Sequence, residues 1–347
     1  MSKTATGILL GLVVAVAIGV IVVALARFDL TGKGGNRLSG DFNYDQSQFE
    51  KIDPALIGYR PAGSFRVELP RPSALAVAPG GIYVAAEKAL GVYDRDGRLL
   101  FQQVLSGRPT CLTVQGQRLY IGMADHVEIL PAGVLNDLPA PTAWPKLQDN
   151  ALLTSIAADD DAVFLADFNN RRILRCDLEG NVAAVIGKRD VENGVPGFIV
   201  PSPYFDLALD RTGRLLAADT GRHRVETYSR DGQLVSFWGQ PGPSIEDFLG
   251  CCNPCHFALL KDGRIVTSEK GVRRVKLYGA DGRFECVVAG PAELAASAPR
   301  PITEEDWPML AADGLDVLVL DGQTGTVTRF VPKTASSASE ASKDSGH

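Results

Sequence analysis

The sequence has no excess of basic charge: 35 Lys and Arg residues stand against 41 Asp and Glu residues, for a net charge of −6. Phosphate backbones are bound through clustered Lys and Arg, and no run of this chain is basic, so nucleic acid is not expected as a partner. Aromatic residues make up only 7% of the chain. Glycine and proline number 36 and 21, and so many turn-forming residues argue against an all-helical bundle.

Histidine is also scarce, with only His126, His223, His256 and His347 in the whole chain. A site that holds a metal with three histidines is therefore not expected. The sequence contains no G-x-S-x-G, H-E-x-x-H or Walker pattern, which leaves hydrolase, metalloprotease and nucleotide-binding interpretations without a motif. These absences favour a protein that is not an enzyme.

One long apolar run stands apart from the rest. Residues 7–26 read GILLGLVVAVAIGVIVVALA, and a helix of this length spans about 30 Å, the hydrocarbon thickness of a bilayer. We predict a transmembrane anchor after a short tail of residues 1–6. A cleaved signal peptide stays open as an alternative because Ala24-Leu25-Ala26 has the form of a cleavage site, and so does a buried hairpin. Long domains translocate largely regardless of charge, so we expect the remainder outside the cytoplasm, in the periplasm or at the cell surface.

A repeat occupies most of the remaining chain. Residues 27–63 are expected to form a stalk, and residues 333–347, rich in Ser and Ala, a disordered tail. Between them, an acidic residue recurs after an apolar run at intervals of 38, 42, 52, 50 and 52 residues. These acidic residues are Glu87, Asp125, Asp167, Asp219, Glu269 and Asp321. Such a period is typical of propeller blades.

Each unit carries four short apolar runs separated by turns. Asp-Gly pairs such as Asp231-Gly232 and Asp281-Gly282 lie between the last two runs, and Asp-Gly between apolar strands is a strong hairpin signal. Six units of four antiparallel strands predict an all-β, six-bladed β-propeller over residues 64–332. The run Phe65–Leu69 precedes the first unit, and we expect it to complete the last blade and close the ring.

Three central units resemble the NHL repeat, in which an acidic residue is followed by turn residues, an Arg and a β-branched residue. The resemblance covers roughly residues 65–332, is weakest around Asp125, and with the apolar run indicates a membrane-anchored bacterial type. It implies that the acid and the Arg of a unit brace neighbouring strands, in the pairs Asp167/Arg172, Asp219/Arg224 and Glu269/Arg274. Some NHL-like propellers are lyases or hydrolases, which the resemblance implies as a further function.

The fifth unit begins with an unusual loop that contains Cys251, Cys252, Asn253, Cys255 and His256. Three interpretations stay open. The pattern Cys252-x-x-Cys255-His256 matches a c-type haem attachment signal. The thiolates, with His256 or the aligned Cys111, also suit a soft metal such as Cu(I) or Zn(II). Lastly, the cysteines suit a disulfide in an oxidising compartment, either vicinal or across the turn.

Propellers place function on the loops that rim the central channel. Residues at strand entries are therefore candidates for a ligand or protein site, namely Tyr204, Phe205, Asn253, Phe257 and Trp307. The sequence predicts a membrane-anchored, extracytoplasmic NHL-type propeller that serves as a binding scaffold, with a protein partner at the rim. The alternative is a redox, metal-carrying or haem-carrying component of a membrane electron-transfer system, which uses the cysteine loop.

Overall fold

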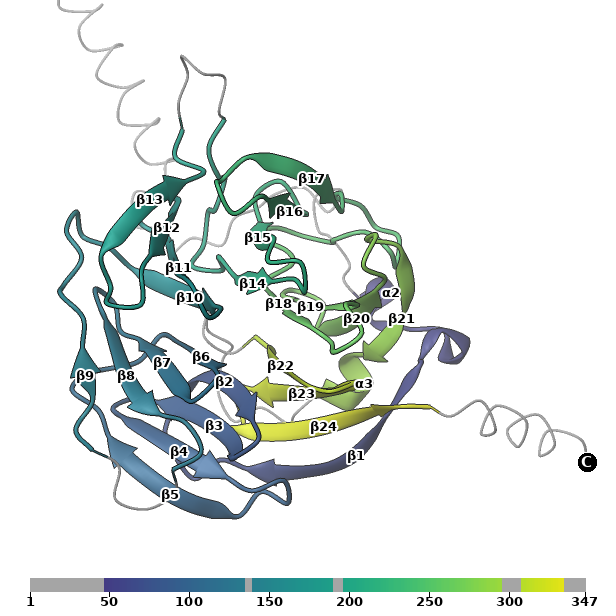
Figure 1. Ribbon diagram of the computed structural model, residues 1–347. Coiled ribbons are helices and arrows are strands. Elements are labelled where there is room, and N and C mark those ends of the chain that lie inside the picture. The colour runs from purple at the N-terminus through teal and green to yellow at the C-terminus, as the bar shows by residue number, and fades with distance from the viewer. Residues whose placement is uncertain (1–46, 135–138, 190–195, 295–306, 334–347) are drawn as a thin grey trace, which may run out of the picture. The chain divides into compact units, whose positions relative to one another are not determined.

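The chain folds into a ring of six antiparallel sheets. The computed structural model describes residues 47–134, 139–189, 196–294 and 307–333. Within these ranges, β1 to β24 form six sheets of four strands each, which are arranged as blades around a central channel (Figure 1). The predicted all-β, six-bladed propeller is confirmed.

Each blade runs from an innermost strand at the channel to an outermost strand at the perimeter (Figure 1). Blades 1 to 3 consist of β2 Pro72–Ala78, β3 Gly81–Ala86, β4 Ala89–Tyr93 and β5 Leu99–Val104; β6 Cys111–Gln115, β7 Arg118–Gly122, β8 Val127–Pro131 and β9 Thr142–Ala143; and β10 Leu153–Ala158, β11 Val163–Asp167, β12 Arg172–Cys176 and β13 Val182–Ile186. Blades 4 to 6 consist of β14 Leu207–Leu209, β15 Leu215–Asp219, β16 Arg224–Tyr228 and β17 Leu234–Trp238; β18 His256–Leu259, β19 Ile265–Glu269, β20 Arg274–Tyr278 and β21 Phe284–Ala289; and β22 Met309–Asp313, β23 Asp316–Asp321, β24 Thr326–Pro332 and β1 Tyr59–Arg66. Three short helical turns complete the described chain, α2 Ser47–Glu50, η2 Pro54–Leu56 and α3 Pro291–Leu294.

The hydrophobic core lies between the blades. All five residues of β11 and of β15 are buried, whereas four of the five residues in the outer strand β17 are exposed. Between blades 3 and 4 the ring of Phe198 packs against Phe205 and Tyr228, at centroid distances of 4.7 and 5.6 Å. A four-stranded blade cannot bury both of its faces alone, so the apolar second strands drive the units to stack.

The turns between the outer strands follow the sequence prediction. Gly282, in the turn before β21, has a φ of +80°, a conformation that L side chains rarely adopt. A Cβ at this position would also lie 2.3 Å from the Cγ of Trp238 in the neighbouring blade. The turn therefore needs glycine both for its own backbone and for close packing between blades.

The N-terminal strand closes the ring, as predicted, but with different bounds. β1 pairs antiparallel with β24, and Phe65 lies opposite Val327. The strand ends at Arg66 rather than Leu69, and it begins at Tyr59, before the predicted boundary at residue 64. Residues 59–63 thus belong to a strand of the propeller and not to a stalk, because Tyr59, Arg60 and Pro61 pair with β24 and the register resumes at Ser64 after an irregularity.

Two of the three predicted acid–arginine pairs form within a blade. Arg172 Nε donates to Asp167 Oδ2 at 2.9 Å, and Arg274 Nε donates to Glu269 Oε2 at 2.8 Å. The third prediction was wrong in its partner, although Asp219 and Arg224 lie opposite each other in the sheet.

In the unit that contains Asp219, each member of the predicted pair bonds a different residue. Asp219 bonds Arg222 in the turn, while Arg224 bonds Glu226 on its own strand. The extra carboxylate at Glu226, which is 2% exposed, attracts the arginine away from Asp219.

The first two units also depart from the predicted frame. Strand register places Ala86 and Met123, not Glu87 and Asp125, at the position of Asp167. Glu87 instead forms a surface ion pair with Arg71. The repeat is therefore complete in its strands but carries the buried acid in only some of its blades.

The predicted membrane helix, residues 7–26, lies outside the described residues, as do residues 334–347 of the predicted tail. Across the ranges that the structure describes, no helix has the length and apolar character needed to cross a membrane.

Candidate functional site

The central channel contains a cavity of about 400 Å³ to which the innermost strand of every blade contributes. Pairing with the second strands places one residue of each blade at an equivalent height. These residues are Ala74, Cys111, Ser155, Asp206, His256 and Met309. Only two of the six carry a carboxylate or an imidazole, and these two lie on adjacent blades.

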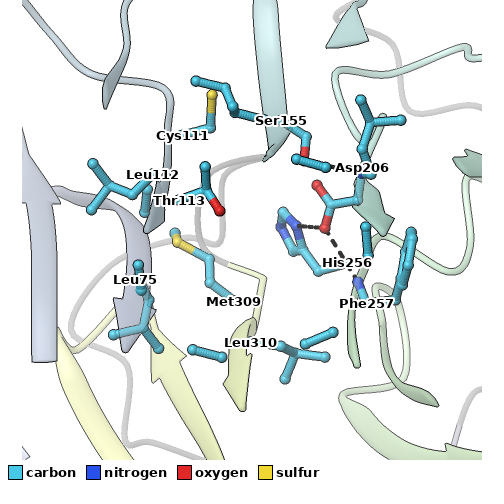
Figure 2. Close-up of a pocket in the computed structure, with 18 of the residues that line it drawn as sticks. Leu75, Cys111, Leu112, Thr113, Ser155, Asp206, His256, Phe257, Met309 and Leu310 are labelled. Carbon is cyan, nitrogen blue, oxygen red and sulfur yellow. Dashed lines mark hydrogen bonds and ion pairs between the residues drawn. The ribbon is translucent and has the colours of Figure 1, made fainter. Parts of the chain in front are cut away.

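Asp206 and His256 form a pair across the gap between blades 4 and 5. His256 Nδ1 lies 3.1 Å from Asp206 Oδ2, and the same oxygen accepts the Phe257 backbone N–H at 3.2 Å. The His256 and Asp206 side chains are 22% and 15% exposed. In Figure 2 the imidazole points into the open centre of the ring, with Thr113 and Met309 on the far side.

The hydrogen bond fixes how the imidazole presents itself to the cavity. Because Nδ1 faces a carboxylate oxygen, Nδ1 carries the hydrogen in the neutral ring and Nε2 carries the lone pair. No hydrogen bond among the described residues engages Nε2. The pair therefore offers a proton acceptor to a molecule in the channel, and a donor when the ring is protonated.

Asp206 also holds the ring of blades together. Ser155, at the equivalent height in blade 3, accepts the Leu207 backbone N–H of blade 4 at 3.0 Å, just as Asp206 accepts the Phe257 N–H of blade 5. A neutral hydroxyl suffices for this contact in blade 3. The carboxylate of Asp206 thus adds an interaction with His256 to a structural role that a serine can fill.

A second cavity of about 380 Å³ forms the mouth of the channel. It shares Ser73, Thr110, Thr154, His256 and Met309 with the channel cavity and adds mainly apolar residues, Pro109, Ala124, Leu152, Leu153, Pro203 and Tyr204, together with Arg108. The ring of Tyr204 lies edge-on to His256, at a centroid distance of 5.4 Å. His256 therefore stands where the mouth meets the channel.

The cysteine loop packs beside this mouth. Cys251 is exposed, whereas Cys252 and Cys255 are buried in a small cluster with Tyr204, against which Trp307 packs. Asn253 is fully buried, accepts the Lys270 N–H at 2.9 Å and donates to the carbonyls of Leu249 and Lys270. Asn253 thus serves as an anchor for the loop rather than as a contact for a ligand.

The expected disulfide is absent from the structure, in which all six cysteines are free thiols. Among the described residues, no group of three or more His, Cys, Asp or Glu side chains is placed to hold a metal ion. Cys255 is fully buried and its Sγ lies 3.3 Å from the Ser268 carbonyl, and His256 is turned to Asp206. The cysteines and His256 therefore do not present a common face to a metal or a haem.

The other predicted site residues are divided between core and channel. Phe205 is fully buried in the core between blades 3 and 4, so it does not reach the rim. Phe257 is 5% exposed and contributes to the lining of the channel cavity. Cys111 also lines that cavity, and burial raises the pKa of its thiol to about 12, so it is a poor thiolate ligand at neutral pH.

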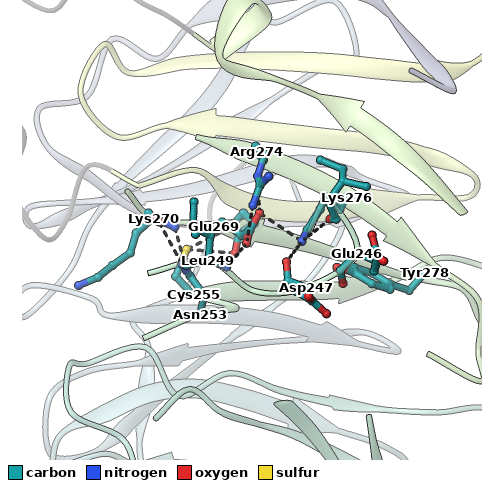
Figure 3. Close-up of polar contacts among 12 residues, drawn as sticks. Glu246, Asp247, Leu249, Asn253, Cys255, Glu269, Lys270, Arg274, Lys276 and Tyr278 are labelled. Atoms are coloured by element: carbon teal, nitrogen blue, oxygen red, sulfur yellow. Dashed lines mark hydrogen bonds and ion pairs between the residues drawn. The ribbon is translucent and has the colours of Figure 1, made fainter. Parts of the chain in front are cut away.

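A charge cluster in blade 5 lies beside Asn253 and Cys255 of the cysteine loop (Figure 3), and its side chains are at most 2% exposed. Glu269 accepts hydrogen bonds from Arg274 and from the Leu249 N–H, and lies 3.3 Å from Lys276 Nζ. Lys276 also donates to the carbonyls of Ile245 and Asp247. This cluster, Glu269–Arg274–Lys276, secures the segment that leads into the cysteine loop.

Comparisons with known proteins identify the fold alone. No protein-family model matches the chain, and no curated protein matches it. Among solved structures, virginiamycin B lyase from Staphylococcus aureus is similar with a TM-score of 0.52 at 11% identity, covering 79% of this chain and 100% of the lyase. A catalytically inactive histidine-to-alanine variant of that lyase with quinupristin gives a TM-score of 0.50 at 9% identity, over the same shares of the two chains. The WD40 β-propeller domain of Doa1 gives 0.51 at 12% identity, over 76% of this chain and 80% of that domain.

Proposed function

We propose that the protein is a ligand-binding propeller whose site is the channel mouth, with His256 and Asp206 as its polar centre. The observation that carries this proposal is the position of His256, which lines both the mouth and the channel while Asp206 holds its Nδ1. A cavity lined by apolar residues with a few convergent polar groups is the usual form of a small-molecule site.

The lining indicates the kind of ligand. Leu152, Pro203 and Tyr204 offer apolar surface to the body of a molecule. The hydroxyls of Thr110 and Thr154 donate to backbone carbonyls and can still accept a hydrogen bond from a ligand. His256 would accept a hydrogen bond from a hydroxyl or amide of the ligand through Nε2. Cavities of about 400 Å³ fall within the range that holds metabolites and drug-sized molecules.

A fragment library screened by ligand-observed NMR tests this proposal. We expect hits that are lost in His256→Ala and retained in His126→Ala. His126 is a matched control, because its Nδ1 also lies close to an aspartate, 2.7 Å from Asp125 Oδ1, but outside both cavities. Hits that persist in His256→Ala, or a screen without hits, would contradict a site at the mouth.

A second candidate function is acid–base catalysis of the lyase type. It is favoured by the imidazole itself, which has one nitrogen bonded to a carboxylate and the other directed at a cavity, the arrangement of a general base. Quinupristin, named with the structurally similar lyase variant, is a probe for this candidate. Turnover that is abolished in His256→Ala and kept in His126→Ala would support it, and no turnover by the wild type would count against a lyase that acts on this probe.

We also propose that the propeller is of the NHL type and is displayed outside the cytoplasm on a membrane anchor at residues 7–26. The uncharged run of twenty residues and the Asp167–Arg172 and Glu269–Arg274 pairs support these two statements. Fractionation of cells that express the full chain should place it with membranes, and a chain without residues 1–27 should be released. A protein partner at the rim stays a prediction.

A further inference from the structure

We propose that Cys251 and Cys252 form a thiol–disulfide exchange site on the rim, which reacts with a disulfide on another molecule. The site is separate from the histidine pair and does not depend on ligand binding in the channel. The argument starts from the different environments of the two neighbouring thiols.

Cys251 is the most accessible thiol of the protein. It is exposed, and all six cysteines lie within the described residues. Burial raises the pKa of Cys176 and of Cys255 to about 12, and it also raises the pKa of the half-buried Cys286. The thiolate is the nucleophile in exchange and must be able to reach the disulfide that it attacks. These buried thiols are closed to an incoming molecule, and Cys251 is the one that an outside disulfide can reach.

Cys252 follows Cys251 in the chain and is only 3% exposed. Burial raises the pKa of its thiol and the neighbouring Cys251 adds to that shift, while a hydrogen bond from Ser202 and the positive charge of Lys270 oppose it only in part. The Ser202 hydroxyl lies 2.9 Å from the sulfur. Cys252 is thus shielded from an outside disulfide but has a hydrogen-bond donor that stabilises its thiolate.

The backbone of this loop is held in an unfavourable conformation. Cys252 has a φ of +62°, a region that residues other than glycine seldom occupy. The buried side chain of Asn253 keeps the backbone there through its bonds to Leu249 and Lys270. Such strain persists only where the surroundings impose it, and it is concentrated at functional sites.

The exchange balances in two steps. The Cys251 thiolate attacks one sulfur of the incoming disulfide, so that a mixed disulfide forms and the first thiol leaves. The Cys252 thiolate then attacks Cys251 Sγ, the Cys251–Cys252 bond forms, and the second thiol leaves. Two protein thiols are oxidised, one disulfide is reduced to two thiols, and the two protons pass from the cysteines to the leaving groups.

The product suits a carrier of reducing equivalents rather than a permanent cross-link. Adjacent Cα atoms lie about 3.8 Å apart across a trans peptide, whereas ordinary disulfides join Cα atoms about 4.4–6.8 Å apart. A bond between neighbours is therefore strained and easily reduced. Both thiols are free in the structure, which is the form from which the first step of the exchange starts.

The test incubates the full chain with oxidised glutathione, blocks the remaining thiols with iodoacetamide and maps the peptides by mass spectrometry. We expect the wild type to form the Cys251–Cys252 disulfide and to recover both thiols with reduced glutathione. Cys252→Ala should trap glutathione on Cys251, and Cys251→Ala should form neither product. Cys176→Ala, a buried thiol elsewhere, is the matched control and should behave as the wild type.

Three outcomes would overturn the proposal: a glutathione adduct on Cys251 of the wild type that never closes, a disulfide between Cys252 and Cys255, or an unreactive Cys251. Circular dichroism of each variant separates loss of chemistry from loss of fold. If Cys252→Ala does not fold, Cys252→Ser replaces it, because serine has the same shape as cysteine and can accept the hydrogen bond from Ser202.

Discussion

The Glu269–Arg274–Lys276 cluster lies within blade 5, and the Asp206–His256 pair joins that blade to blade 4. The polar groups of the two sites are arranged in opposite ways. Glu269 and Arg274 are 1% and 2% exposed, and the cluster is enclosed by partners from β19, β20 and the 245–249 segment. Asp206 and His256 are partly exposed, and the imidazole keeps one nitrogen for the cavity. A buried charge requires a full set of partners, whereas a pair on a cavity can leave one group for a ligand. The closed cluster therefore maintains the fold, and the open pair is available for function.

The largest loss of stability should follow from removing the carboxylate of the Glu269–Arg274–Lys276 cluster. Glu269→Gln removes the only acidic partner of Arg274 and Lys276 in the ion pairs of the described residues, and leaves two cations buried. Breaking a buried pair in this way costs about 3–5 kcal/mol of unfolding free energy. Urea denaturation should show a loss of this size, and a loss under about 1 kcal/mol would mean that the cluster is not closed.

The buried cluster should also make the free energy of unfolding depend on pH, through the titration of Lys276. Burial lowers the pKa of Lys276 from 10.5 to about 8. Below pH 8 the lysine is charged in both the folded and the unfolded chain, and the folded chain bears the desolvation penalty in full. Between pH 8 and 10.5 the unfolded chain binds a proton that the folded chain releases, so the free energy of unfolding rises with pH.

This contribution can be isolated with one variant. Relative to Lys276→Met, the wild type should gain roughly 3 kcal/mol of unfolding free energy between pH 8 and 10.5. Urea denaturation of the two proteins at several pH values measures the difference between them, in which other titrations cancel. A difference that stays constant with pH would show that Lys276 has the same pKa in the folded and the unfolded chain.

A substitution in the Asp206–His256 pair should weaken ligand binding while leaving the free energy of unfolding nearly unchanged. Asp206→Ser copies the contact that Ser155 makes with Leu207, so the Phe257 N–H keeps an acceptor while His256 loses its carboxylate. We expect the unfolding free energy to change by about 1 kcal/mol or less, and channel ligands to bind at least tenfold more weakly. Calorimetric titration with a fragment hit measures the second effect, and equal affinity in both proteins would remove Asp206 from the site.

The smallest effect should come from Glu87, which the sequence repeat, but not the strand register, aligns with Glu269. Glu87 pairs with Arg71 at the surface, where the two side chains are 40% and 59% exposed. Exposed pairs contribute about 0–1 kcal/mol. Glu87→Gln should therefore leave the urea midpoint almost unchanged, and a shift comparable to that of Glu269→Gln would erase the distinction between the two acids.

Much of the fold could be predicted from local patterns. The acid–turn–Arg strings and the Asp-Gly turns are short-range signals, because the residues involved lie within one hairpin. The partner of Asp219 could not be predicted in this way, since the choice between Arg222 and Arg224 depends on the burial of Glu226. The N-terminal end of β1 could not be predicted for a related reason, because the strand pairs with residues 326–332, at the other end of the propeller sequence.

The candidate site was only half visible in the sequence. The sequence singles out His256 only as the last residue of the pattern Cys252-x-x-Cys255-His256, and it does not single out Asp206. The two residues lie fifty positions apart, and no motif joins them. Aligning the innermost strands would have revealed them, because each residue directly precedes the first apolar residue of its strand, Leu207 or Phe257.

The pairing of β1 with β24 determines when the ring can close as the chain is synthesised. The strand that enters first during synthesis has no sheet to join until the last strand has emerged, since its hydrogen bonds run to residues 326–332. A chain that stops before Thr326 leaves the edges of both β1 and β23 open, and open strand edges are where chains associate wrongly. Only a chain extended through Pro332 can seal the ring, so the native fold requires that β24 has been synthesised.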